Sequence, residues 1–430
     1  MQRPHRTVLV IGANGFLGAH IAAALRRNGW RVLRAVRGKG RDLQPDERQC
    51  DLQRMLNVRD WLPLLDGVHA VVNAAGILRE ERGQTFQTIH TSAPLAAAHA
   101  CVQAGVTRFV QISALGDPED GEFIASKHAF DSALLALPLD AVVLRPSLVY
   151  SVAGSYGGTS LLRAIAGFPG WQWLPGDAHW PVQPVAAEEL AALVAAAVDN
   201  GANGMYEVGG PVPIALRDYQ RAWRHWLRIP GQRSVQVPEA AISLQVWLWE
   251  RIGSGPVGET MWRMLRRGNV TQPAAHANLA RDFGIAPQPL SDVLATYPSQ
   301  TQDRWHAQLY FLAPALRGCV AILWLLSAWV GWSASAEQIH GLLDGTALQS
   351  THMVTWARAA AALDVVLGVW LLSGWRLRLL IGLMGASVLV YTLAFGIFAP
   401  ALWRDLLGGL AKNLVVLPAL AVLWVLADRR

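Results

Sequence analysis

Three glycines near the start of the chain have the spacing of a loop that could hold a pyrophosphate. The run GANGFLG occupies residues 12–18 and places glycine at Gly12, Gly15 and Gly18. Glycine at the first position permits a tight turn, the second lets the backbone approach a phosphate, and the third allows a helix to pack closely on a strand. Glycine turns are common, so the flanking segments must support this interpretation.

The flanking segments have the periodicities of strands and a helix. Residues 7–11 (TVLVI) form a continuous apolar run typical of a strand buried on both faces. Residues 19–28 show a helical pattern that ends at Gly29, and residues 31–36 have the pattern of a second strand. Strand, glycine loop, helix and strand within about thirty residues predict a dinucleotide-binding βαβ unit.

The end of the second predicted strand bears on which dinucleotide is bound. An NAD site commonly has Asp or Glu there, which accepts a hydrogen bond from the ribose 2′-hydroxyl. Here Arg37 and Lys39 follow the strand and no carboxylate does. A guanidinium suits a 2′-phosphate through two parallel hydrogen bonds, which favours NADP(H) over NAD(H). The alternative is that both cations belong to a solvated turn.

Further apolar runs predict parallel strands that carry candidate site residues at their carboxyl ends, where open α/β sheets bind ligands. The predicted fold class of the first 300 residues is therefore α/β, a doubly wound parallel sheet of the Rossmann type, with a substrate-side lobe mainly at 150–300. The predicted strands are 70–72 before Asn73, 109–112 before Ser113, and 141–144 before Arg145 and Pro146, with helical patterns at 92–104 and 126–137.

These pieces, in this order, resemble the extended and atypical short-chain dehydrogenase/reductase superfamily over roughly residues 5–300. The resemblance implies an NAD(P)-binding domain with oxidoreductase or epimerase-like chemistry. The segments that carry it are GANGFLG, CDL (50–52), NAAG (73–76), QISALG (111–116), SKHAF (126–130), RPSLVY (145–150), WLPGDAHWPVQPVAAEEL (173–190) and YEVGGP (206–211).

The resemblance also implies positions for the cofactor. Asp51 and Leu52 would lie near the adenine, and residues 73–76 would lie along the dinucleotide. Ser113 and Lys127 would flank the nicotinamide as candidate catalytic residues. The full set of predicted cofactor-binding residues is Gly12, Asn14, Gly15, Phe16, Leu17, Gly18, Arg37, Lys39, Asp51, Leu52, Asn73, Ala74, Ala75, Gly76, Lys127 and Pro146.

One position departs from the family pattern. The family's catalytic base is the tyrosine of Tyr-x-x-x-Lys, whose phenol is acidified by the lysine. Here the window reads Phe-Ile-Ala-Ser-Lys, so Phe123 replaces the tyrosine and Lys127 is retained. Catalysis would need a substitute base, for which Tyr150, Tyr156 and His90 are the candidates. A closer analogy is the atypical members that resemble the nucleotide-binding accessory subunit of respiratory complex I.

Two amphipathic stretches in the substrate-side lobe allow two interpretations. Residues 242–249 and 261–267 have tryptophans on or near apolar stripes. The first interpretation places these tryptophans in the core. The second makes the stretches a lid on a membrane surface, with Arg263, Arg266 and Arg267 near lipid headgroups.

Composition changes sharply after about residue 308. The whole chain of 430 residues is only 16% charged and 52% apolar, with a mean hydropathy of +0.25, whereas a soluble domain is about 25% charged. Four apolar stretches of about 20 residues predict an all-α, four-helix transmembrane domain within residues 301–430. The stretches are 309–332, 355–374, 377–399 and 407–426, and tryptophans near their ends fit an aromatic belt: Trp329, Trp332, Trp356, Trp375, Trp403 and Trp424.

Charges in this domain predict its orientation and its polar interior. Arginine is richer in segments that would face the cytoplasm if the first domain does, so we expect both ends inside. Asp364 lies in mid-span and could pair with Lys412 or Arg317, either structurally or as part of a site for a quinone or lipid headgroup. Asn413 is the fourth intramembrane polar residue. The stretches 403–414 and 302–314 resemble DoxX-like four-helix membrane domains, a family often fused to short-chain reductases.

The remaining features limit the function classes. The net charge of +6 comes from scattered arginines, not from basic clusters with interleaved aromatics, so we expect no nucleic-acid partner. Cys50, Cys101 and Cys319 have no metal-ligand spacing, and no metal site is predicted. Residues 1–7 are polar and the apolar run after them is too short for a signal peptide, which predicts a cytoplasmic first domain at a bacterial inner membrane.

Two hypotheses follow from these features. The first is a membrane-anchored NAD(P)(H)-binding oxidoreductase, acting on a hydrophobic quinone or isoprenoid-like substrate at the inner membrane face. The alternative is a non-catalytic NAD(P)H-binding sensor or assembly factor for a membrane redox complex. Phe123 favours the second hypothesis, whereas the retained Ser113 and Lys127 favour the first.

Overall fold

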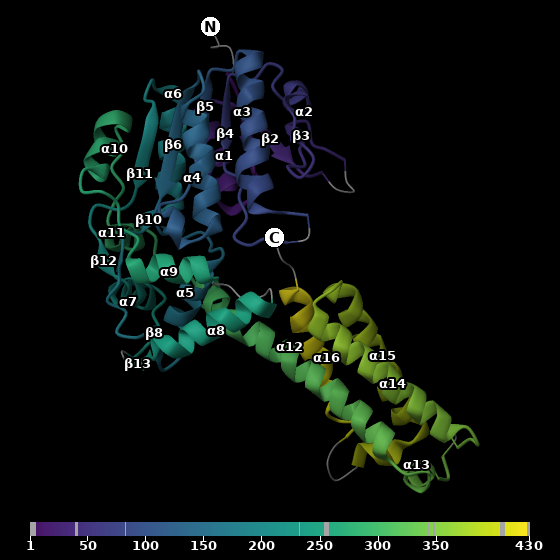
Figure 1. Ribbon diagram of the computed structural model, residues 1–430. Coiled ribbons are helices and arrows are strands. Elements are labelled where there is room, and N and C mark those ends of the chain that lie inside the picture. Colours follow the sequence, from purple (N-terminus) through teal and green to yellow (C-terminus); the bar gives the residue numbers. More distant parts are fainter. Residues whose placement is uncertain are drawn as a thin grey trace. The chain divides into compact units, whose positions relative to one another are not determined.

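The computed structural model describes residues 6–38, 42–81, 83–231, 233–252, 258–342, 344–346, 349–404 and 409–427. It contains two compact units, Met1–Gln308 and Leu309–Arg430 (Figure 1). Lys39, one of the predicted cofactor-binding residues, lies outside the described residues.

A seven-stranded parallel sheet forms the centre of the first unit, in the order β11-β6-β5-β4-β1-β2-β3. In β1, Leu9 pairs with Leu33 on one side and with Val71 on the other. The chain runs outward from β1 in one direction and from β4 in the other, and open α/β sheets bind ligands at the carboxyl ends of the strands where this order reverses. The strands are β1 Thr7–Ile11, β2 Arg31–Val36, β3 Glu47–Gln49, β4 Ala70–Asn73, β5 Arg108–Ile112, β6 Asp140–Pro146 and β11 Gly204–Val208.

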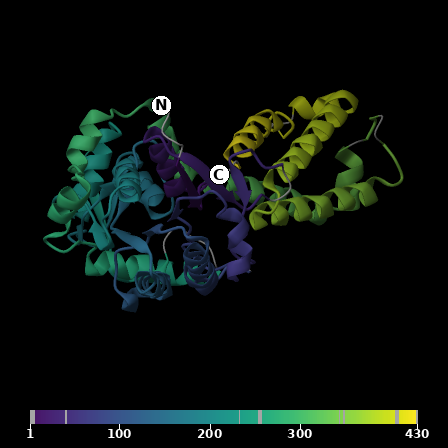
Figure 2. The same ribbon diagram turned by 90° about the horizontal axis from the view of Figure 1, so that it is seen from above.

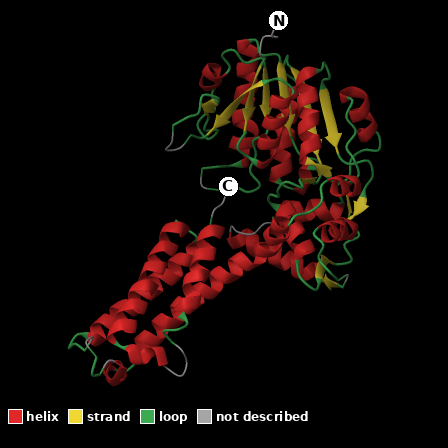
Figure 3. Ribbon diagram, turned by 180° about the vertical axis from the view of Figure 1, so that it is seen from behind, coloured by secondary structure: helices red, strands yellow, loops and turns green. Residues whose placement is uncertain are grey.

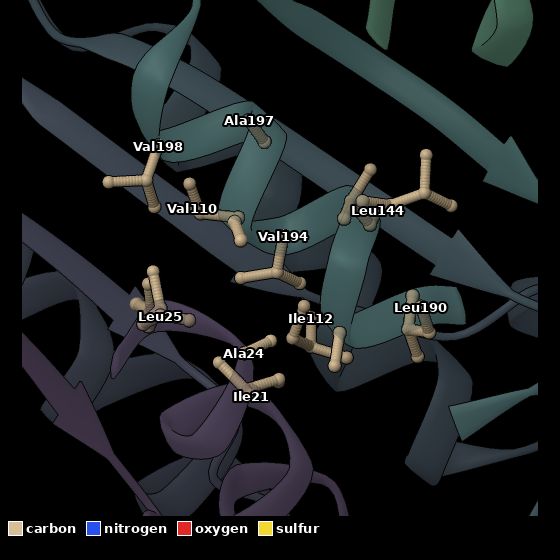
Figure 4. Packing of buried hydrophobic residues seen from close by; sticks show 14 of the residues in the cluster. Ile21, Ala24, Leu25, Val110, Ile112, Leu144, Leu190, Val194, Ala197 and Val198 are labelled. Carbon is tan, nitrogen blue, oxygen red and sulfur yellow. The ribbon is translucent and has the colours of Figure 1, made fainter. Parts of the chain in front are cut away.

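Helices cover both faces of the sheet (Figures 2 and 3). α1 (Phe16–Arg27), α6 (Ala187–Asp199) and α10 (Ala275–Phe283) pack on one face. Figure 4 shows Ile21 and Leu25 of α1 facing Val194 of α6 across this core. The other face carries α2 (Val58–Trp61), α3 (Ala93–Ala104) and α4 (Glu122–Leu135), joined by the turns η1 (Leu62–Leu64) and η3 (Pro118–Asp120) and the π-helical turn η2 (Gln87–Ser92).

Strict alternation along the strands divides these two cores. Val8 and Val10 of β1 face α1 and α6, whereas Leu9 and Ile11 face α3 and α4. Period two is the geometry of any strand, and burial on both sides explains why the sequence shows a continuous apolar run. Burying a side chain such as Leu25 contributes about 2 kcal/mol.

The substrate-side lobe has its own aromatic core, which includes Trp180, Tyr219 and Trp223. Its elements are short, because they wrap around this core and not around a large sheet. They are β7 Val149–Tyr150, α5 Gly158–Gly167, β8 Gln172–Pro175, β9 Pro181–Val182, β10 Val185–Ala186, β12 Ile214–Ala215, α7 Leu216–Trp226, β13 Ser234–Val237, α8 Glu239–Ile252, α9 Glu259–Arg267 and α11 Leu290–Thr296.

The second unit is helical. α12 (Thr301–Ser333), α14 (Met353–Ser373) and α15 (Leu377–Phe398) are each long and apolar enough to cross a bilayer. They pack with α16 (Asn413–Leu426) around a core that includes Trp324, Leu371 and Met384. The unit also contains α13 (Ala336–Leu342) and the turn η4 (Pro400–Arg404).

The fourth predicted span differs from the structure. Residues 407 and 408 lie outside the described part, and Gly409 to Lys412 form turns, so α16 begins at Asn413. Its 14 residues rise about 21 Å, less than the roughly 30 Å of a hydrocarbon core. The apolar composition of residues 407–412 made the span look longer than the helix is.

The expected ion pair of Asp364 is also replaced by another contact. The Ser327 hydroxyl donates to an Asp364 carboxylate oxygen at 2.7 Å, and the Arg317 guanidinium donates to the Leu372 carbonyl at 2.8 Å. No ion pair joins Asp364 to Arg317 or Lys412 within the described residues. Asn413 donates to the Thr392 hydroxyl at 3.0 Å. Neighbouring hydroxyls and carbonyls, which the spacing of charges could not reveal, take the place of the predicted partners.

Candidate functional site

The glycine loop between β1 and α1 is held by close backbone contacts. Gly12 has φ +77°, and a Cβ built on it would lie 2.8 Å from the Ala75 nitrogen. A Cβ on Gly18 would lie 2.1 Å from the Gly12 carbonyl oxygen, and Gly15 donates its N–H to that oxygen at 2.9 Å. Side chains at Gly12 or Gly18 would therefore displace the backbone that shapes the loop.

The N-terminus of α1 is open to an anion. Gly15 is the N-cap, makes no side-chain cap, and no acidic residue lies in the first turn. The unpaired N–H groups and the helix dipole both favour a phosphate there. The Phe16 ring beside it stacks on Tyr156, with ring centroids 6.3 Å apart. The carboxyl end of β1, the loop and α1 thus form the cradle that the sequence predicts for a pyrophosphate.

Arg37 lies exposed just beyond β2, and no hydrogen bond or ion pair joins it to any described residue. Its neighbour on the strand, Arg34, instead binds Asp46 through two nitrogens at 3.0 Å and reaches Asn14 at 3.4 Å. The Arg34 hydrogen bonds hold the pKa of Asp46 below its usual value. The Asp46 carboxylate beside β2 is therefore already paired with Arg34, which the sequence did not reveal.

Local hydrogen bonds hold Asp51, which is predicted to lie near the adenine, and Asn73, which is predicted to lie along the dinucleotide. Asp51 accepts from the Gln53 N–H at 3.3 Å and pairs with Arg54 at 3.8 Å. Asn73 is buried at the end of β4, where its amide donates to Gln111 at 2.8 Å and its oxygen accepts from the Ala75 N–H. These bonds fix the turn from Ala74 to Gly76.

Gly76 ends that turn and lies close to two further candidate residues, Lys127 and His90. A Cβ on Gly76 would lie 3.4 Å from the Lys127 ammonium nitrogen and 3.5 Å from His90 Nε2, so these groups converge on one point. Lys127 is buried on α4 and donates to the Ile112 carbonyl at 3.1 Å. Burial lowers the pKa of Lys127 to about 8. The ammonium retains donors beyond that one backbone acceptor.

Ser113 belongs to a buried charge network. Its hydroxyl donates to Asp131 at 2.7 Å, and the same Asp131 oxygen accepts from two Arg145 nitrogens at 2.9 Å. The Pro146 carbonyl accepts from the Leu115 N–H at 2.9 Å, which fixes the segment after Ser113. Asp131 follows Lys127 by four residues on α4, a spacing that places both on one helix face. That spacing was the available signal for Asp131, which the sequence reasoning missed.

Phe123 stands one helical turn before Lys127 and packs in an aromatic cluster with Phe86 and His90. Its ring centroid lies 5.5 Å from that of His90 and 6.1 Å from that of Phe86, both edge to face. The Lys127 nitrogen lies 5.8 Å from the Phe123 ring centroid. A phenyl ring, with no proton to transfer, therefore lies beside the ammonium.

Both ring nitrogens of His90 are engaged. The Ile77 N–H donates to His90 Nε2 at 3.0 Å, so Nε2 is the unprotonated nitrogen. Nδ1 lies 2.9 Å from the Ser126 hydroxyl and must carry the ring proton. Burial and the nearby Lys127 charge lower the pKa of His90 to about 3. This geometry favours a structural role for His90 over that of a base.

The two candidate tyrosines have opposite environments. Tyr150 is buried in the lobe core against Trp223, and its hydroxyl has no partner among the described residues. Burial raises the pKa of Tyr150 well above its usual value. Tyr156 is 62% exposed over Phe16. Of the three candidates, only Tyr156 is open at the cofactor loop.

Helix α9 contacts the same site from the lobe. Arg267 binds the buried Asp120 through both oxygens, at 3.2 and 2.6 Å. A Cβ on Gly121 would lie 2.4 Å from the Thr260 hydroxyl oxygen. Arg267 is thus an ion-pair partner of the site loop, and Trp262 is a core residue that donates to Ser243. For Trp262 the core interpretation is confirmed. The ion pair of Arg267 with Asp120 was not predicted.

Comparisons with known proteins agree with this geometry. Residues 8–167 match the model of the NAD dependent epimerase/dehydratase family, and residues 321–424 match that of the DoxX-like family. Among solved structures, WbmH of Bordetella bronchiseptica in complex with NAD+ matches with a TM-score of 0.50 and 18% identity, covering 68% of this chain and 96% of that one. This likeness shows the fold.

Curated relatives match parts of the chain. A ceramide reductase of Caulobacter vibrioides is 32% identical over 150 residues, 33% of this chain and 46% of the relative. Subunit 9 of the NADH dehydrogenase [ubiquinone] 1 alpha subcomplex of Rattus norvegicus is 29% identical over 147 residues, which are 32% of this chain and 39% of the relative. A divinyl chlorophyllide a 8-vinyl-reductase of Zea mays is 29% identical over 267 residues, and the match covers 56% of this chain and 64% of the relative.

The chain covers less than two thirds of each of these relatives. Its two matched regions correspond to its two units, a Rossmann sheet and a helical bundle with candidate membrane spans. The chain thus joins an NAD-dependent epimerase/dehydratase-like domain of the short-chain dehydrogenase/reductase type to a DoxX-like domain.

Proposed function

We propose that this protein is a membrane-anchored NAD(P)H-dependent reductase that acts on a hydrophobic, quinone or isoprenoid-like substrate. The names of two relatives, a ceramide reductase and a vinyl-reductase, support reductase chemistry. The observation that carries the proposal is the buried Lys127 ammonium, which converges with Gly76 at the nicotinamide side of the loop.

The residues present fit a nicotinamide dinucleotide. Gly12, Gly15 and Gly18 leave the space that the pyrophosphate needs, and Arg37 has a free guanidinium for the 2′-phosphate of NADP(H). Lys127 would bind the nicotinamide ribose hydroxyls with the ammonium protons that Ile112 does not accept. Such a cofactor supplies a hydride when bound.

Loss of the tyrosine hydroxyl supports a particular substrate class. Reduction of a simple ketone produces an alkoxide, a base about as strong as hydroxide. Reduction of a quinone produces a phenolate-type anion, whose conjugate acid has a pKa of about 10. An ammonium with a pKa of about 8 protonates a phenolate favourably. Because a phenolate is the weaker base, hydride transfer to a quinone depends less on a proton donor at the reacting oxygen than transfer to a ketone does. Loss of the tyrosine hydroxyl is therefore better tolerated with a quinone as substrate.

The membrane domain gives the proposal its location. We propose that α12, α14 and α15 and the shorter α16 anchor the chain in a bacterial inner membrane. The arginine distribution supports a cytoplasmic dinucleotide domain and a cytoplasmic C-terminal end. A phosphatase reporter fused after residue 430 tests this, because periplasmic activity would contradict the orientation.

Phe123 supports the alternative of a non-catalytic sensor or assembly factor for a membrane redox complex. Its ring packs in the aromatic cluster with His90 and carries no group that could donate a proton. The similarity to a subunit of an NADH dehydrogenase points the same way. Turnover of a substrate separates the two proposals.

The test uses the full chain in lipid nanodiscs with NADPH, a ubiquinone analogue and, separately, a simple aliphatic ketone. We expect fast oxidation of NADPH with the quinone and only slow oxidation with the ketone. Phe123→Tyr places a hydroxyl beside Lys127, so this variant should gain ketone reduction by about 100-fold over the wild type. Phe86→Tyr is the matched control, because it adds the same hydroxyl one ring away.

Three results distinguish the outcomes. If neither NADPH nor NADH binds at micromolar concentration, the dinucleotide proposal is wrong. Binding without turnover of any quinone would favour the sensor. Ketone reduction by the wild type at the rate of Phe123→Tyr would contradict the substrate argument, because the missing hydroxyl would then have no effect.

A further inference from the structure

One end of the substrate-side lobe exposes large apolar side chains. Trp171 is 51%, Trp247 49% and Trp305 62% exposed, values unusual for tryptophan in a water-facing surface. We call this set the tryptophan face; its members are Trp171, Trp173, Leu244, Trp247, Leu248 and Trp305.

Packing within the first unit connects the elements that carry the face. β8 pairs with β13, with Trp173 opposite Val235, and a Cβ on Gly176 would lie 3.3 Å from the Glu239 carboxylate at the start of α8. Phe168 contacts Trp173, and the adjoining Gly167 packs on Ala307 of α12. In Figures 1 and 3, β8, β13 and α8 lie at the same end of this unit.

The exposed side chains are not needed for the core beneath them. In α8, Val246 is buried in the lobe core, while Trp247 and Leu248 point away from it. In β8, Gln172 is buried, while Trp171 and Trp173 on either side are exposed. Each element therefore has one face packed inward and a second apolar face outward, which marks an interaction surface.

Cations accompany the tryptophans. The Arg251 guanidinium lies 4.3 Å from the Trp247 ring centroid. Arg233 is exposed beside β8, where its carbonyl accepts from the Gln172 N–H at 2.9 Å. The nearby acids of α8 already have partners, because Glu239 pairs with Arg266 and Glu250 with Arg79. Exposed tryptophan interleaved with arginine is typical of surfaces in the headgroup region of a bilayer.

Chain continuity selects a bilayer over a soluble partner. Ala307, buried in the lobe core, and Trp305, on the tryptophan face, both belong to the first turns of α12. The same continuous helix is the first candidate membrane span, and its predicted apolar stretch begins at Leu309. Trp305 thus precedes the span by about one helical turn.

We propose that the tryptophan face lies in the interfacial region of the bilayer that the second unit crosses, with Arg233 and Arg251 at anionic headgroups. This rests on the proposed membrane insertion and is independent of the proposed reaction. The face differs from the sequence prediction of a membrane lid, because the arginines then named are tied to Glu259, Glu239 and Asp120.

The experiment measures membrane depth in the full chain, in nanodiscs of phosphatidylcholine and phosphatidylglycerol that contain an acyl-chain spin label. An environment-sensitive fluorophore is attached to single cysteines introduced as Trp173→Cys and Trp247→Cys in a Cys319→Ser background. Val102→Cys, on α3, is the control for an exposed apolar position away from the face. Native Cys319 on α12 is the reference for the span, and the buried Cys50 and Cys101 should not label.

We expect quenching at 173 and 247 at least about twofold above that at 102 and below that at 319, because an interfacial position lies shallower than the middle of the span. Quenching at 173 and 247 no greater than at 102, with 319 quenched, would overturn the proposal and indicate a protein or solvent contact. An unquenched fluorophore at 319 would overturn it together with membrane insertion. Unchanged dinucleotide binding by each variant shows that the first unit is folded.

A second set of substitutions tests the charge component in the Trp173→Cys background, with the other tryptophans of the face unchanged. Arg233→Glu combined with Arg251→Glu should reduce quenching at residue 173 by about twofold in discs with phosphatidylglycerol. The same change should have no effect in discs of phosphatidylcholine alone. Equal loss in both discs would show that the two arginines act through the fold of the lobe, and would contradict their assignment to anionic headgroups.

Discussion

The glycine loop at the start of α1 and the first two turns of α4 both belong to the proposed dinucleotide site, yet they follow the family pattern to different degrees. In the loop, Gly12, Gly15 and Gly18 all occur, and backbone contacts leave no space for side chains at Gly12 and Gly18. In α4, Lys127 is present and Phe123 has replaced the hydroxyl that it normally acidifies. Binding depends on backbone shape, whereas proton transfer depends on single functional groups. One site can therefore keep its capacity to bind the dinucleotide while its proton-transfer groups change.

The largest expected effect concerns the α4 side. Lys127→Met should lower the quinone reduction rate by about 10²–10⁴-fold, because it removes the proton donor. The wild-type rate should fall as pH rises through about 8, where the ammonium loses its proton. Steady-state kinetics over pH 6–10 in nanodiscs measure both effects.

A thermal melt provides the control for this variant. Burial lowers the pKa of Lys127, so the charged ammonium destabilises the folded state at pH values below that pKa. At pH 7, Lys127→Met should therefore unfold at a higher temperature than the wild type. A variant that loses activity and also melts lower would indicate a structural role, and an unchanged rate would refute the catalytic assignment.

The loop side comes next. Gly18→Ala places a methyl group 2.1 Å from the Gly12 carbonyl oxygen, so the loop must shift. We expect dinucleotide affinity to fall by about 10–100-fold, the equivalent of 1–3 kcal/mol of strain. Titration calorimetry measures it. Gly201→Ala is the matched control, since its Cβ would meet no atom within 4 Å; equal affinities in both variants would contradict the steric argument.

Cofactor preference should change by a smaller factor. Arg37→Asp removes the proposed partner of the 2′-phosphate and should weaken NADPH binding by about tenfold, with little loss of NADH binding. Competition binding with the two nucleotides gives the ratio. Arg217→Asp, on α7, makes the same charge change at an exposed position of the lobe. A proportional loss for both nucleotides would assign Arg37 to the solvated turn.

The last expected effect is on stability and not on activity or binding. Because the pKa of His90 falls to about 3 on folding, the unfolded chain binds more protons between pH 3 and its usual value of about 6.5. Stability is therefore fully present above pH 6.5 and is lost on acidification, by about 1 kcal/mol per pH unit. His90→Asn should flatten this dependence in denaturant melts, whereas His99→Asn, at an exposed position of α3, should not. Parallel curves for wild type and His90→Asn would show that His90 does not titrate in this range.

Local sequence patterns predicted much of the secondary structure of the first unit. The structure places β1 at Thr7–Ile11 and β2 at Arg31–Val36, the ranges that the apolar runs predict. Strands buried on both faces require continuous apolar residues, so composition alone marks them. The short strands of the lobe and the true start of α16 were not predicted. They depend on pairing and packing with distant segments, and the apolar residues before Asn413 look the same in a helix and in a turn.

The sequence by itself therefore determined the dinucleotide loop, the retained Lys127 and the missing hydroxyl at Phe123, because these follow from residue types at fixed short spacings. Only the tertiary structure decided what surrounds them. It engages both ring nitrogens of His90, buries Tyr150 in an apolar core, and pairs Ser113 with Asp131. The physical reason is that hydrogen-bond partners and burial come from segments far apart in the chain, and side-chain chemistry depends on both.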